Sequence, residues 1–154
     1  EMNVNYIFSA HAKLNIPIVA GETNKLELIT KMIKRIKYKK FKLKMLGFGV
    51  FANKKPLLYL RWEQNSDLLK LVQLINKRTS NLFNKKIDYY GGIPSFWVPK
   101  TSIAYKDFKY SQLELILKKI NFLHNSKYAM INSIDLIDFT EEKRDILLKE
   151  NYLS

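Results

Sequence analysis

Two short segments of this sequence place polar side chains at positions i and i+2 of a predicted strand. His11 and Lys13 lie in the first segment, and Lys100 and Ser102 lie in the second. Because side chains two residues apart in a strand point to the same face of the sheet, each segment presents a pair of polar groups to one side. An imidazole, two ammonium groups and a hydroxyl can bind an anion and transfer protons. We therefore expect the two pairs to form one four-cornered polar site.

The rest of the sequence predicts the strands and helices that would position these segments. The first half of the chain predicts a strand over residues 5–18, a helix with Asn24 and Glu27 as a capping box, a β-hairpin over 41–62 and a helix from Ser66. The second half predicts a loop over 81–95, a strand over 96–105, a helix capped by Ser111 and Glu114, and strands over 128–139 and 144–152. This βαββαβαββ order predicts an α+β fold, with antiparallel sheets and helices packed on their outer faces.

Length and composition predict one globular domain over residues 1–154. The chain is 47% hydrophobic, which is sufficient for a core, and it has no cysteine, so disulfides and thiolate chemistry are excluded. Lysines interrupt every apolar run before it reaches the roughly 20 residues that span a bilayer. We expect an intracellular, cytoplasmic protein without a membrane partner.

The net charge of +13 favours a polyanionic partner such as RNA or a nucleotide. A composition rich in Lys, Asn, Ile, Tyr and Phe is also what an AT-rich genome imposes, so a merely solvated basic surface is the alternative. The same two interpretations apply to the densest run of cations, which either follows a phosphate backbone or is the solvated face of a helix. Its members are Lys31, Lys34, Arg35, Lys37, Lys39 and Lys40.

Three stretches of the sequence resemble the 2H phosphoesterase family, which includes 2′,5′ RNA ligase-like proteins and cyclic phosphodiesterases. "YYGGIPSFWVPKTSIAYKDF" resembles the family's aromatic-rich approach to its second H-x-T/S strand, and "FKLKMLGFGVFANKKPLLYLRW" resembles the hairpin between its two motifs. "INSIDLIDFTEEKRDILLKENYL" looks like its closing hairpin. His11 and Lys100 are 89 positions apart, similar to the family's motif spacing. The resemblance implies a 2H phosphoesterase-like fold.

The resemblance also implies a role for each of the four polar residues. His11 matches the family's first histidine and Ser102 its second hydroxyl, whereas Lys13 replaces the first hydroxyl and Lys100 replaces the second histidine. In the family the histidines transfer protons at a 2′,3′-cyclic phosphate or a 2′,5′ linkage, and the hydroxyls donate to phosphoryl oxygens. We assign His11 and Lys100 to the catalytic positions, and Lys13 and Ser102 to phosphate binding.

The two lysines favour binding over catalysis. A lysine with an ordinary pKa of about 10.4 is protonated at neutral pH and cannot act as a base, but it binds phosphate well. The leading hypothesis is an RNA- or nucleotide-phosphate-binding protein whose hydrolysis is weak or lost. One alternative is an active RNA 2′,3′-cyclic or 2′,5′-phosphodiesterase, in which His11 is the base and Lys100 the acid. Another is a structural subunit that binds a partner chain or nucleic acid through its basic surface.

Two further expectations concern aromatic residues and the sheet edge. Trp97 and Tyr90 are candidates for stacking on a base, although aromatic residues at this density often belong to a core. The family's first strand and helix have no counterpart before His11, so we expect either a C-terminal module or fragment of a longer protein, or a partner chain that covers the open edge. The sequence predicts neither a metal site nor a cofactor.

Overall fold

The computed structural model of the protein describes residues 16–52, 54, 56–88, 97–105, 108–121, 127–138 and 146–153. Its elements, in chain order, are β1 (Val19–Glu22), α2 (Leu26–Lys34), β2 (Phe41–Phe51), β3 (Leu57–Trp62), α3 (Ser66–Thr79), β4 (Lys85–Asp88), β5 (Lys100–Tyr105), a 3-10 turn (Tyr110–Gln112), α4 (Leu113–Asn121), β6 (Tyr128–Ile131), β7 (Ser133–Asp138) and β8 (Ile146–Tyr152).

The fold class is α+β with antiparallel sheets, as predicted. One sheet has the strand order β5-β3-β2-β6, and two further pairs are β1-β4 and β7-β8. The pairs β2-β3, β3-β5, β1-β4 and β7-β8 are all antiparallel. In the part of the chain that the structure describes, no helix is long and apolar enough to cross a membrane.

The described residues belong to two compact units, each assembled from distant parts of the sequence. The first unit contains Lys44–Glu63 and Pro99–Ala129, and the second contains Pro17–Leu43, Gln64–Val98 and the chain from Met130 onward. One domain over residues 1–154 stays a prediction.

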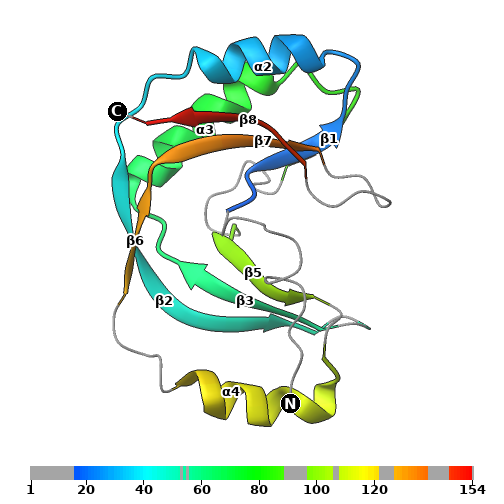
Figure 1. Ribbon diagram of the computed structural model, residues 1–154, viewed down its shortest axis with the longest axis vertical. Helices are drawn as coiled ribbons and strands as arrows, with labels where there is room; N and C mark the ends of the chain where they lie inside the picture. The colour runs from blue at the N-terminus through cyan, green and yellow to red at the C-terminus, as the bar shows by residue number, and fades with distance from the viewer. Residues whose placement is uncertain are drawn as a thin grey trace. The chain divides into compact units, whose positions relative to one another are not determined.

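The first unit has a core between α4 and one face of the sheet formed by β2, β3 and β5 (Figure 1). Leu58 and Ala104 of the sheet and Ile116 of α4 are buried there together with Phe108. α4 is amphipathic, so its polar side carries the exposed pair Lys118–Glu114. α4 therefore covers the face of the sheet that carries Leu58 and Ala104 and does not cover the opposite face.

The second unit packs α2 against the hairpin of β7 and β8 (Figure 1). α2 buries Ile29 and Ile33, which recur at helical spacing. α3 begins at the N-cap Asn65, whose side chain accepts a hydrogen bond from the backbone N–H of Leu68 at 2.9 Å. α3 buries the side chains Leu68, Leu71, Val72, Ile75 and Thr79.

Several boundaries and caps predicted from the sequence were wrong. Residues 85–88 of the predicted loop form β4, because they pair with β1 more than sixty positions away. Asn24 does not cap α2; the Thr23 hydroxyl accepts from the N–H of Lys25 instead.

The other corrections concern the second half of the chain. Ser111 lies inside a 3-10 turn, whose start is closed by a hydrogen bond from the Lys109 N–H to Oε1 of Gln112. The predicted strand over 128–139 divides at Asn132 into β6 and β7, and the strand expected from residue 96 begins at Lys100.

Candidate functional site

The second polar segment of the sequence lies on β5, and the pairing of β5 with β3 decides which way its side chains point. Lys100 pairs with Arg61, and Ser102 pairs with Tyr59. Residues directly opposite each other in an antiparallel pair carry their side chains on the same face. Lys100, Ser102, Tyr59 and Arg61 therefore share one face, which we call the cationic face. The i, i+2 spacing predicts the same side for Lys100 and Ser102.

The residue between them points to the other face and is structural. The Thr101 hydroxyl accepts a hydrogen bond from Nε1 of Trp62 at 2.9 Å, and both side chains are buried. This bond satisfies the indole N–H away from water. Thr101 thus ties β5 to β3 beneath the cationic face.

A β-bulge in β5 places Ser102 on the cationic face and Ala104 on the opposite, core face of the sheet. Ser102 pairs with Tyr59, but Ala104 pairs with Leu58, so Ile103 is the extra residue. Strict alternation would turn Ala104 toward the cationic face. The bulge turns Ala104 into the core instead, while Ser102 keeps its place.

Lys100 is half-buried, and this burial lowers the pKa of its ammonium group. The cause is desolvation, which disfavours the charged form. Its Nζ lies 5.5 Å from the ring centroid of Phe51, within the range of cation–π attraction. The Phe51 ring stacks on Tyr59 with centroids 4.7 Å apart and an interplanar angle of 28°. The ammonium group therefore lies against an aromatic pair.

A glycine on β2 makes room for this aromatic pair. Gly49 lies opposite Tyr59, and a Cβ at Gly49 would be 2.3 Å from Cζ of the Tyr59 ring. Gly47, by contrast, has a φ of 131° beside a register shift, so it serves a bulge.

The cationic face concentrates positive charge. Lys100 and Arg61 are like charges directly opposite each other on neighbouring strands, an arrangement that is unfavourable unless an anion offsets it. Neither forms an ion pair with any residue that the structure describes. Arg61 is exposed, and Ser102 adds a hydroxyl that can donate. Two cations and a hydroxyl on one face can bind a phosphate or carboxylate.

Of the remaining predicted site residues, the structure describes Trp97 alone. His11, Lys13 and Tyr90 lie outside the described residues. Trp97 belongs to the second unit and is only 6% exposed, and its carbonyl oxygen accepts a hydrogen bond from Nε2 of Gln64. Its burial favours the core interpretation over stacking on a base.

Sequence reasoning missed Arg61 and the Phe51–Tyr59 pair as parts of the site. The alternation in residues 57–62 was a usable signal, because it places Tyr59 and Arg61 on the same side of the predicted hairpin. Their meeting with Lys100 depends on the register between β3 and β5, which the alternation does not give.

No family model matches the sequence, and no curated protein shows significant similarity to it.

Proposed function

We propose that the protein binds the phosphate group of a nucleotide or of an RNA, and that its hydrolysis of such ligands is weak or lost. The pairing of Lys100 with Arg61 on one face is the observation that carries this proposal. A phosphate between two such cations accepts charge-assisted hydrogen bonds and removes their mutual repulsion. Arg61 provides the planar, bidentate donor that a phosphate oxygen pair prefers.

The same proposal includes the finer fold, a 2H phosphoesterase-like domain. The α+β class, the β2-β3 hairpin and the position of Lys100 and Ser102 on β5 support it. In that fold His11 and Lys13 would complete the site from the first motif strand. The resemblance of the sequence motifs remains the basis of this step.

An active phosphodiesterase is the second candidate, because one observation favours it. Burial lowers the pKa of Lys100, and a lysine with a lowered pKa gives up its proton more readily. Lys100 would then protonate the leaving oxygen while His11 acts as base at a 2′,3′-cyclic phosphate or a 2′,5′ linkage. Loss of the second histidine opposes this role.

Calorimetric titration with a nucleoside 2′-monophosphate tests the binding proposal. Lys100→Gln and Arg61→Gln should each weaken binding about 10- to 100-fold, since a hydrogen bond to a charged group contributes roughly 1.5–3 kcal/mol. Lys118→Gln is the matched control, because Lys118 is an exposed cation that pairs with Glu114 on α4. Equal affinity of Lys100→Gln and the wild type would contradict the proposal.

Turnover assays separate the two candidates. The wild type and Lys100→His are incubated with 2′,3′-cyclic nucleotides and with 2′,5′-linked oligoadenylate. We expect little turnover by the wild type and a gain in Lys100→His, which restores the family's second histidine. Wild-type turnover that His11→Ala abolishes would establish the active enzyme instead.

A further inference from the structure

A second concentration of positive charge lies in the second unit, on α2 and the chain that follows it. The sequence has no acidic residue between Glu27 and Glu63, but eleven lysines and arginines. Seven of them, all exposed, lie in the second unit and form what we call the basic strip: Lys31, Lys34, Arg35, Lys37, Lys39, Lys40 and Lys42.

Buried apolar residues hold the basic strip in place from below. Ile33 and Ile36 are buried at the end of α2, and Phe41 and Leu43 are buried at the start of β2. The cations occupy the positions between them and are therefore turned outward. The strip changes from helix to extended chain without losing its exposed charge.

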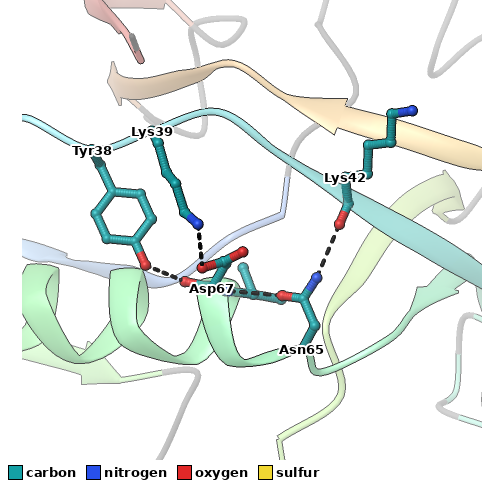
Figure 2. A network of polar contacts seen from close by, with 6 residues as sticks. Tyr38, Lys39, Lys42, Asn65 and Asp67 are labelled. Carbon is teal, nitrogen blue, oxygen red and sulfur yellow. Dashed lines mark hydrogen bonds and ion pairs between the residues drawn. The ribbon is translucent and has the colours of Figure 1, made fainter.

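Three hydrogen bonds link the segment that carries the strip to α3 and its N-cap, and Figure 2 shows two of them, at Tyr38 and at Lys42. The Tyr38 hydroxyl donates to the Asp67 carbonyl oxygen at 2.8 Å, and Nδ2 of Asn65 donates to the Lys42 carbonyl oxygen at 2.9 Å. Nη1 of Arg78 donates to the Arg35 carbonyl oxygen at 3.5 Å. A surface held in this way loses less conformational entropy when it binds a ligand.

Internal ion pairs offset little of this charge. Lys39 lies 3.5 Å from Oδ1 of Asp67 and is the one member of the strip that forms an ion pair within the described chain. Six neighbouring cations therefore repel one another across the surface. A polyanion that spans them would release that repulsion.

The aromatic residues of this segment are not free to stack. Phe41 is buried, and the Tyr38 ring packs edge-on against it with centroids 6.1 Å apart. The Tyr38 hydroxyl is already engaged by Asp67. The strip thus offers charge without a stacking platform, which suits contacts to phosphates rather than to bases.

We propose that the basic strip binds the phosphodiester backbone of an RNA without reading its bases. A membrane surface fits less well, because α2 buries Ile29 and Ile33 in the protein. Its exposed large apolar side chains, Leu26 and Leu28, are confined to the first turn and leave little apolar surface to enter a bilayer. The inference rests on the proposed function, since it extends the ligand from one nucleotide phosphate to a longer strand. The two surfaces can nevertheless be tested separately.

The test measures binding of a labelled single-stranded RNA by fluorescence anisotropy between roughly 50 and 200 mM salt. The strip variant combines Lys34→Gln, Arg35→Gln, Lys37→Gln and Lys40→Gln. The control variant removes the same charge from exposed lysines of the first unit. It combines Lys109→Gln, Lys118→Gln, Lys119→Gln and Lys127→Gln.

We expect the strip variant to bind more than tenfold more weakly than the wild type at the lower salt. Its plot of log affinity against log salt should also be shallower by up to about 3, because each lost phosphate contact of a single strand removes about 0.7 from the slope. The control variant should keep most of both quantities. The strip variant should still bind a nucleoside 2′-monophosphate. This measurement distinguishes an error in assigning RNA to the basic strip from an error in assigning phosphate to the cationic face.

Several outcomes would overturn the assignment. Equal losses in the strip and control variants would show that net charge alone drives binding. A strip variant that loses binding to anionic vesicles but not to RNA would identify a membrane surface. Single-stranded DNA of the same sequence bound at least tenfold more tightly would refute RNA as the ligand.

Discussion

Lys100 combines two properties that rarely coincide in a lysine: it is half-buried, and it lies directly opposite another cation. Burial lowers its pKa, whereas a bound phosphate would favour its charged form and raise the pKa again. Phosphate binding must therefore take up a proton once the pH exceeds the pKa of free Lys100. This linkage makes the role of Lys100 visible in a pH profile.

We predict that affinity for a nucleoside 2′-monophosphate falls as the pH rises through the pKa of Lys100. The fall should begin below the ordinary lysine value of about 10.4 and should not exceed about tenfold per pH unit. The ligand does not contribute, because its second ionisation, near pH 6, is complete in this range. Titration calorimetry at increasing pH measures the effect.

Lys100→Arg is the control for this profile. Arginine stays charged throughout the range, so its affinity should hold to higher pH than that of the wild type. The same decline in both proteins would assign the titration to another group and would contradict a direct contact between Lys100 and the phosphate.

At the scale of elements, Asn65 connects the start of α3 with the first residues of β2. Its Oδ1 caps the helix at Leu68, and its Nδ2 donates to the Lys42 carbonyl oxygen (Figure 2). Loss of an N-cap costs roughly 0.5–2 kcal/mol, and an unpaired carbonyl adds to that cost where water cannot reach it. The residue thus stabilises both a helix and the basic strip.

We predict that Asn65→Ala lowers the free energy of unfolding by about 1–2 kcal/mol. Asn65→Asp keeps the cap but not the amide donor, so it should cost less than the alanine variant. Urea denaturation of the three proteins measures both differences. An aspartate variant as unstable as the alanine variant would place the main contribution in the contact with Lys42 rather than in the cap.

The sequence predicts those helices and strands whose own apolar residues recur with a regular spacing. α2 and α3 repeat apolar residues at helical spacing, and β2 alternates buried and exposed residues. β4 has only four residues, begins with two lysines and exists because β1 pairs with it. Its partner is too distant in sequence for any local pattern to reveal it.

The candidate site divides in the same way. The i, i+2 spacing gave Lys100 and Ser102 a common side, because alternation within one strand is local. Arg61 joins them only through the register of β3 with β5, which pairs it with Lys100. A single sequence shows neither the register nor the bulge, so half of the cationic face was not predictable.

For the molecule as a whole, the net charge of +13 acts on stability as well as on binding. Self-repulsion opposes the compact state, and salt weakens it by shortening the Debye length from about 30 Å at 0.01 M to about 8 Å at 0.15 M. The free energy of unfolding should therefore rise with sodium chloride over this range. Charges that lie close together contribute most to this rise.

The basic strip should consequently reduce stability where it promotes RNA binding. At low salt we predict that the variant with Lys34, Arg35, Lys37 and Lys40 changed to Gln is more stable than the wild type by about 1 kcal/mol, since each like-charge neighbour pair costs roughly 0.2–0.5 kcal/mol. The control variant of the first unit loses the same charge from lysines outside the strip and should gain less. Thermal and urea unfolding of the three proteins at two salt concentrations measure the gains. Equal gains in the free energy of unfolding would mean that the repulsion is spread over the whole surface. A larger gain in the strip variant, together with its weaker RNA binding, would mean that the fold holds these cations together against their own repulsion.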